Sequence, residues 1–180
     1  AMATQVATFG GGCFWCIETA FNTLEGVESA ISGYCGGDQA SANYKAVCSG
    51  QTAHAEVVQI TFDDQVTSFQ ALLTFFFSLH DPTQLNRQGN DVGPQYRSVI
   101  FYHDETQKRI AQAAIDEFVA GDVFPDPIVT ALSAMSAFYP AEDYHQGYYE
   151  SHQHEPYCAM VITPKLAKFK QRYPSALKTN

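Results

Sequence analysis

The sequence lacks any apolar segment long enough to cross a membrane. The longest candidate, residues 72–79, is far shorter than the roughly 20 residues that a spanning helix needs. A charged N-terminal stretch followed by an apolar one is also missing, so we expect no secretory signal peptide. These absences predict a cytoplasmic protein that does not bind membranes. Ala1, which precedes Met2, is interpreted as an added residue outside the natural chain.

Positive charge is scarce over most of the chain. Lys and Arg number 10 against 19 Asp and Glu, and every acidic residue lies at or before Glu155. Because an acidic surface repels phosphate backbones, we expect no nucleic-acid binding. The C-terminal end is the exception, and its cations predict the solvated face of a last helix, with an RNA-binding tail as the alternative. These residues are Lys165, Lys168, Lys170, Arg172 and Lys178.

The chain also lacks the even set of cysteines that a disulfide scaffold needs. Its five cysteines predict a reducing compartment in which thiols serve chemistry or packing. Repeats, low-complexity tracts and linkers are missing as well. With 46% hydrophobic and 16% charged residues, the composition predicts one globular domain over residues 1–180, which we expect to be monomeric.

Hydrophobic periodicity and capping residues predict the elements. Strands are expected over 5–9, 27–34, 55–62 and 97–103, with one or two more within 128–138. Helices are expected over 13–24, 68–79, 104–119 and 142–152, with a final helix opened by Pro164. Residues 80–95 form a long polar connection, which is typical of a functional loop. The predicted helices and strands alternate irregularly along the chain. This indicates an α+β fold, a two-layer sandwich of a mixed sheet with helices packed on it.

A thiol lies where the first helix is expected to begin. Cys13 follows the glycine run 10–12, and helix N-termini favour a thiolate through free N–H groups and the helix dipole. A cysteine nucleophile must reach that ionised form. Cys16 follows at the Cys-x-x-Cys spacing of dithiol redox motifs. Because free cysteines are often buried, two packing thiols are the alternative.

Several other side chains are candidates to assist such a thiol. Glu56 opens a mostly apolar strand, and burial there would raise its pKa and allow it to donate a proton. The alternative is a solvated carboxylate at a strand edge. The long loop carries Asp91 and ends at Tyr96, while Tyr44 lies in an earlier polar loop. Each tyrosine taken alone is more typical of packing than of catalysis.

Zinc and phosphate sites are the remaining candidates. His145, His152, His154 and Cys158 lie close together in the sequence and contain zinc-binding side chains. No paired short spacing of a zinc finger completes them, so we expect no metal site. The glycine run lacks the rest of a P-loop or dinucleotide fingerprint.

Several motifs follow one another over nearly the whole chain. They are GCFW (12–15), HAEVV (54–58), HDPT (80–83), NRQGNDVG (86–93), QYRS (95–98) and YPAEDYHQ (139–146). In this order they resemble the peptide methionine sulfoxide reductases of the A type. The resemblance implies a ferredoxin-like core and reduction of methionine-S-sulfoxide, protein-bound or free, as a repair of oxidative damage.

The resemblance also implies site roles. The nucleophile would be Cys13, which attacks the sulfoxide and is left as a sulfenic acid. Its partners would be the proton donor Glu56, the sulfoxide-binding hydroxyls of Tyr44 and Tyr96, the supporting acid Asp91, and the methyl-binding aromatics Phe14 and Trp15. These types suit the chemistry, because a sulfoxide oxygen leaves only when protonated and the methyl group needs an apolar wall.

A second thiol must convert the sulfenic acid into a disulfide. Cys158 is favoured because relatives carry a resolving thiol near the C-terminus, and Cys16 is the alternative. Cys35 and Cys48 match no required role and are interpreted as packing thiols. The resemblance implies thioredoxin as the reductant and no metal or organic cofactor.

Two other functions stay open at this point. A thioredoxin-type dithiol oxidoreductase would use Cys13 and Cys16, but it leaves Glu56 and the long loop without a role. A zinc-stabilised interaction module would lose its fold on chelation.

Overall fold

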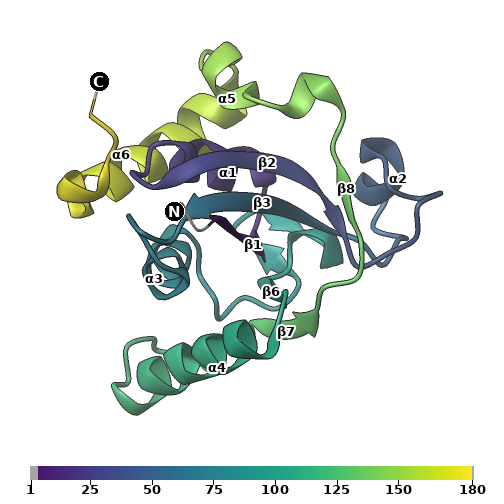
Figure 1. Cartoon of the computed structure of the whole chain (residues 1–180). Helices are drawn as coiled ribbons and strands as arrows, with labels where there is room; N and C mark the ends of the chain where they lie inside the picture. Colours follow the sequence, from purple (N-terminus) through teal and green to yellow (C-terminus); the bar gives the residue numbers. More distant parts are fainter. Residues whose placement is uncertain (1–3, 180) are drawn as a thin grey trace.

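A six-stranded sheet organises the computed structural model, which describes residues 4–179 (Figure 1). Ala1, interpreted above as an added residue, lies outside the described residues. The strand order is β7-β6-β1-β3-β2-β8. These strands are β1 (Thr4–Gly10), β2 (Val27–Cys35), β3 (Ala55–Asp63), β6 (Val99–Tyr102), β7 (Ala131–Ala134) and β8 (Phe138–Pro140).

The four central strands have ferredoxin-like topology. β3 is antiparallel to both β1 and β2, so β1 and β2 are parallel to each other with β3 between them. Helix α1 (Phe14–Asn22) connects β1 to β2, which makes this a split βαβ unit. α3 (Phe69–Leu79) connects β3 to β6, and β6 pairs with β1. The parallel pair β6–β7 makes the sheet mixed, so the predicted α+β class and core are confirmed.

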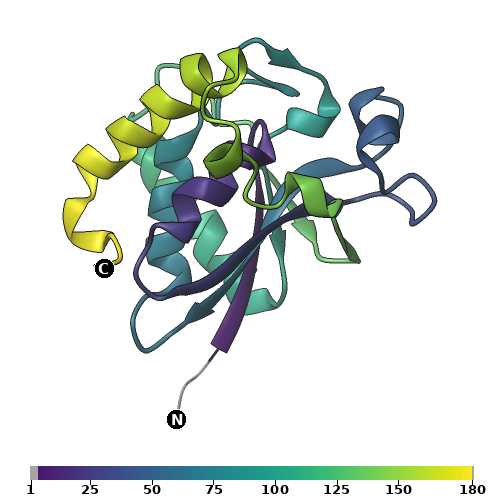
Figure 2. The same ribbon diagram turned by 90° about the horizontal axis from the view of Figure 1, so that it is seen from above.

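Side-chain alternation along β3 separates two cores of unequal size. Val58, Ile60 and Phe62 point into the larger core, where α1, α3 and α6 (Thr163–Arg172) pack on the sheet. Figure 2 shows α6 alongside α1 on this face. Ala55 and Val57 point the other way into a smaller cluster. Because strand side chains alternate, Glu56 belongs to the helix-covered face.

Most predicted element types are confirmed. Ser68 and Asp104 cap α3 and α4 (Glu105–Ala120) through side-chain oxygens that accept backbone N–H bonds. Pro164 lies in the first turn of α6. Both strands allowed within the 128–138 region form, although the second, β8, runs past its end to Pro140.

The helix predicted over 142–152 is wrong. The segment contains a 3-10 turn, η2 (Asp143–His145), and the single-turn α5 (Tyr148–Ser151). Gly147 separates them with a φ of 65°, which a continuous right-handed helix cannot contain. The break lets the chain bend across the start of α1.

Five short elements in three segments had no periodic signal. The loop 80–95 contains a hairpin of β4 (Arg87–Gln88) and β5 (Asp91–Val92), followed by the 3-10 turn η1 (Pro94–Tyr96). α2 (Tyr44–Cys48) is a single helical turn. A π-helical turn, Cys158–Ile162, precedes α6. Elements this short present too few residues for a period to emerge.

Among residues 4–179, no helix combines the length and apolar character needed to span a membrane.

Candidate active site

The glycine run brings the long polar loop against the start of α1. Gly12 has a φ of 87°, and its N–H donates to the carbonyl oxygen of Tyr96 at 3.1 Å. A β-carbon at Gly11 would lie 2.8 Å from the ring of His80. The chain therefore needs glycine at both positions, one for its conformation and one for close approach. This contact places the two ends of the long loop beside the next residue, Cys13.

Cys13 occupies the N-cap of α1, as the sequence predicts. Burial nevertheless raises the pKa of its thiol well above the ordinary value, and the charge of Glu56 raises that pKa further. The nearby backbone N–H of Trp15 counteracts this rise in pKa only in part. The helix position thus favours the thiolate, as expected, but desolvation outweighs it in the empty site. The resting thiol is protonated at neutral pH.

Glu56 lies beside Cys13 as a neutral acid. Its carboxyl oxygen accepts the Phe14 backbone N–H at 3.1 Å, and only 1% of the residue is exposed. Burial raises the pKa of Glu56 to about 8, and the nearby charge of Asp91 adds to the rise. At pH 7 the group carries a proton next to the thiol, which is the state that a general acid requires.

Two phenol hydroxyls belong to the same pocket. The hydroxyls of Tyr44 and Tyr96 both lie within reach of the Cys48 thiol and within the field of Glu56. Burial raises the pKa of both phenols, so each remains a hydrogen-bond donor. Glu142 positions the first, because its carboxylate accepts the backbone N–H of Tyr44 at 3.0 Å.

Asp91 approaches from the hairpin on the other side of Cys13. Its carboxylate accepts the hydroxyl of Tyr157 at 2.6 Å, and both residues line the cleft that contains Cys13. Tyr157 therefore holds the supporting acid in the same cleft as the candidate nucleophile.

The two aromatic residues after Cys13 occupy different depths. Phe14 is fully buried, and its ring packs against Tyr44. Trp15 is half-buried, stacks on Tyr148 at 3.8 Å, and donates its indole N–H to His145 Nδ1 at 3.0 Å. Stacking and this hydrogen bond hold the indole in one orientation, as an apolar wall requires.

The two candidate resolving cysteines are both buried and free. Cys16 and Cys13 line the same cleft, which has a volume of about 550 Å³. Cys158 is completely buried at the first position of the π-helical turn, next to Tyr157. Burial raises the pKa of both thiols.

Cys48 is not the packing thiol that the sequence suggests. Its side chain is exposed at the end of α2, beside the two phenols, whereas Cys35 is fully buried. Four residues separate Tyr44 from Cys48, which is one helical turn, but nothing in the sequence indicates that a helix forms there.

Sequence reasoning missed Tyr157 and His145 as parts of the site. Tyr157 precedes Cys158, and only the cysteine was considered as a candidate. His145 was considered only as a zinc ligand. His145 is 1% exposed and serves Trp15 through Nδ1. Within residues 4–179, no three His, Cys, Asp or Glu side chains are grouped so that they could hold a metal ion.

A thiol at a helix N-terminus, a buried neutral carboxyl and two phenols are the site of a thiol-based oxidoreductase. The family model of the peptide methionine sulfoxide reductases matches residues 5–177. The chain belongs to this family, and its relatives assign it to the A type.

The relatives cover nearly the whole chain. The peptide methionine sulfoxide reductase MsrA of Chromobacterium violaceum is 52% identical over 174 residues, which are 97% of this chain and 99% of that protein. The MsrA of Leptospira borgpetersenii is 53% identical over 165 residues, which are 92% and 93% of the two chains.

Solved structures agree with the fold. Mxr1 of Saccharomyces cerevisiae in reduced form is 32% identical with a TM-score of 0.78, covering 86% of this chain and 89% of that one. Methionine sulfoxide reductase A of Corynebacterium diphtheriae is also 32% identical, with a TM-score of 0.71 and coverage of 83% and 75%. The protein is therefore an oxidoreductase that reduces methionine sulfoxide and so repairs oxidative damage.

Proposed function

We propose that Cys13 is the nucleophile and Glu56 the proton donor in the reduction of methionine-S-sulfoxide, protein-bound or free. The observation that carries this assignment is a buried carboxyl, neutral near pH 7, held beside the thiol by the Phe14 N–H. A neutral donor is needed because the sulfoxide oxygen is a poor leaving group until it is protonated.

The first step transfers one oxygen atom. The Cys13 sulfur bonds to the substrate sulfur while Glu56 protonates the sulfoxide oxygen, with Tyr44 and Tyr96 donating hydrogen bonds to it. The hydroxyl group then moves from the substrate sulfur to the Cys13 sulfur as the transient sulfur–sulfur bond breaks, and methionine departs. Cys13 is left as a sulfenic acid, and its former thiol proton restores Glu56. Phe14 and Trp15 supply the apolar wall for the methyl group, and Asp91 supports the site through Tyr157.

The second step removes that oxygen as water. A thiol attacks the sulfenic acid, a disulfide forms, and the hydroxyl leaves with the attacking thiol's proton. We assign this role to Cys158, with Cys16 as the alternative. Tyr157, the neighbour of Cys158, lines the same cleft as Cys13, and a π-helical turn is a common local device at functional sites. Cys16 is one turn from Cys13, where a bridge distorts the helix.

A dithiol protein then reduces the disulfide by exchange. We propose thioredoxin for this step; yeast Mxr1, which shares this fold, is known in complex with Trx2. We further propose that the chain acts as a single-domain monomer in the cytoplasm, where a reducing environment keeps its five free thiols available. Light scattering at micromolar concentration checks the monomer, and cell fractionation checks the compartment.

The deciding experiment is turnover of each sulfoxide epimer with dithiothreitol, which bypasses the choice of resolving cysteine. We expect consumption of the S epimer alone by the native enzyme and none by Cys13→Ser. A folded Cys35→Ser variant, at a buried thiol away from the site, serves as the control for thiol loss and keeps its S-epimer turnover. If Cys13→Ser retains activity, the assignment of the nucleophile is wrong.

A further inference from the structure

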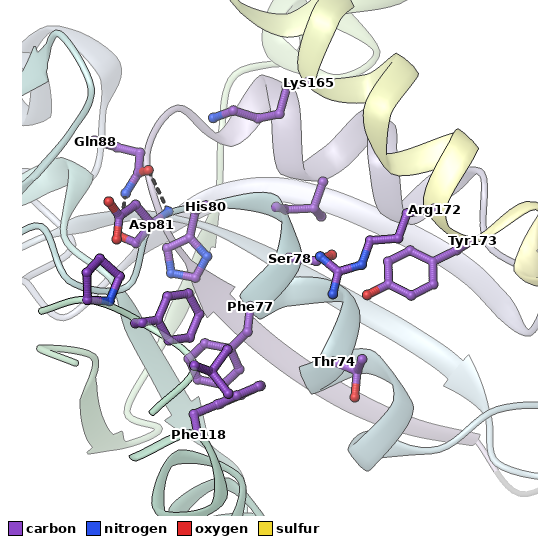
Figure 3. Close-up of a pocket in the computed structure, with 14 residues that line it drawn as sticks. Thr74, Phe77, Ser78, His80, Asp81, Gln88, Phe118, Lys165, Arg172 and Tyr173 are labelled. Carbon is purple, nitrogen blue, oxygen red and sulfur yellow. Dashed lines mark hydrogen bonds between the residues drawn. The ribbon is translucent and has the colours of Figure 1, made fainter. Parts of the chain in front are cut away.

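A second cavity adjoins the catalytic cleft and has no role in the reaction described above. It has a volume of about 580 Å³ and lies between the end of α3, residues 118–125 and α6. Figure 3 shows its composition, with the rings of Phe77 and Phe118 on one side and the charged ends of Lys165 and Arg172 on the other.

The two cations share one face of α6. Seven residues separate them, which is two helical turns and a rise of about 10 Å along the axis. Neither side chain forms an ion pair or a hydrogen bond with any residue between 4 and 179, and Arg172 only lies 5.3 Å from the ring centroid of Tyr173. Lys168 and Lys170 are exposed and line neither cavity, as the predicted solvated helix face requires.

The second cavity adjoins the cleft that contains Cys13. Gln88 and Lys165 line both spaces. The charge of Lys165 influences Cys16 on the catalytic side and His80 on the other, so the ammonium group lies between them. A chain that leaves the cleft past Gln88 therefore meets Lys165 first and Arg172 beyond it.

The other ionisable groups of the cavity only partly offset these cations. Asp81 accepts the backbone N–H and the hydroxyl of Thr83 at the cavity wall, and its carboxylate balances one of the two positive charges. Burial lowers the pKa of His80 to about 4, so this ring is uncharged at pH 7, and both of its nitrogens have partners. The lining thus keeps one excess positive charge in a protein whose net charge is −9.

We propose that this cavity binds an acidic segment of a polypeptide substrate next to its oxidised methionine. The inference rests on the proposed function, because it requires that methionine sulfoxide lies at Cys13. An extended chain rises about 3.3 Å per residue, so two acidic residues three positions apart span the distance between Lys165 and Arg172. An apolar residue between them meets Phe77 and Phe118. Free methionine sulfoxide does not reach this subsite.

The test is a competition between paired peptides with dithiothreitol as reductant. Both peptides of a pair contain one methionine sulfoxide; one peptide carries Glu-x-x-Glu and the other Gln-x-x-Gln. In successive pairs this motif is moved one position at a time, on either side of the methionine sulfoxide. The ratio of products gives the ratio of kcat/KM. Exposed ion pairs contribute up to about 1 kcal/mol each, so we expect a preference of about threefold to tenfold at the best position and a loss of it in high salt.

Variants then assign the preference to the cavity. Lys165→Gln and Arg172→Gln each reduce the preference for the acidic peptide, and the double variant removes it. Lys170→Gln, the same change elsewhere on α6, preserves it. Turnover of free methionine sulfoxide stays unchanged in Arg172→Gln and Lys170→Gln, which lie outside the catalytic cleft, and this separates failure of the inference from failure of the proposed function.

Two results would overturn the proposal. One is equal use of the Glu and Gln peptides at every position by the native enzyme. The other is an acidic preference that survives in the double variant. If the double variant instead raises only the KM for thioredoxin, these cations bind the reductant and the substrate subsite does not exist.

Discussion

The two sides of Cys13 are built in different ways. On one side, Glu56 comes from a central strand and Phe14 from the first turn of α1, and both lie in the best-packed part of the molecule. On the other side, Tyr157 and Cys158 come from irregular chain, where short turns and a π-helical segment follow one another. We thus assign oxygen removal from the substrate to the well-packed side. Recycling of the Cys13 thiol is assigned to the irregular segment, whose hydrogen bonds are easier to rearrange.

This difference follows from what each step needs. Protonation of the sulfoxide requires donors already aimed at one point, because reorientation during the reaction raises the barrier. Disulfide formation requires two sulfur atoms about 2 Å apart, and Cys158 starts fully buried in its own turn. A segment that opens locally at a low free-energy cost lets the two sulfur atoms meet. The same freedom would misalign the proton donors in the first step.

The largest effect should come from removing the recycling thiol. Cys158→Ser should release one equivalent of methionine per enzyme and then stop when thioredoxin is the reductant, because the sulfenic acid has no partner. Rapid quench and disulfide mapping by mass spectrometry measure both steps. Cys16→Ser is the matched control and should continue to turn over. Reversal of the two phenotypes would transfer the resolving role to Cys16.

On the rigid side, Glu56→Gln should slow methionine release by about 10²- to 10⁴-fold, since it removes the proton but keeps the shape. The pKa of Glu56 is about 8, so the native rate should fall as pH rises through 8 and the donor ionises. The variant should lose this descending limb. Glu18→Gln, at another buried carboxyl, should leave the limb in place. An unchanged limb in Glu56→Gln would assign it to another group.

The phenols should have a smaller effect than the carboxyl. Tyr44→Phe and Tyr96→Phe each remove one hydrogen bond to an oxygen that gains charge, which corresponds to about a tenfold to hundredfold loss in single-turnover rate. Tyr157→Phe is the comparison from the irregular segment that carries Cys158, and we expect it to affect disulfide formation more than methionine release. Equal effects of all three on methionine release would remove the division between the two sides.

The smallest expected effect concerns the junction of the two sides. Gly12→Ala forces a β-carbon into a positive φ and to within 2.9 Å of Gln88, so the free energy of unfolding should fall by about 1–3 kcal/mol. Urea denaturation measures this change. Gly121→Ala is the control, because its φ of −85° suits alanine. A Gly12→Ala protein as stable as the native one would show that the loop adapts.

Much of the architecture was predictable because it depends on local patterns. Ser68 and Asp104 mark the starts of two helices, and alternation identified the central strands. The prediction of a helix over 142–152 failed because Gly147 takes a left-handed conformation, in which its N–H donates to Glu18 of α1 at 2.7 Å. Tyr157 and Cys48 were missed as neighbours of the site because they join it from chain segments far away in sequence.

By itself the sequence determined the family, the reaction and the identity of the candidate nucleophile, because motifs and helix caps are local and survive without knowledge of contacts. Only the tertiary structure decided the protonation states, since burial raises the pKa of Cys13 against what its helix position favours and keeps Glu56 from being the solvated carboxylate that the sequence left open. It also decided that two C-terminal cations point into a cavity beside the catalytic cleft. Desolvation and cavity shape depend on which distant segments pack together, and no local pattern encodes that.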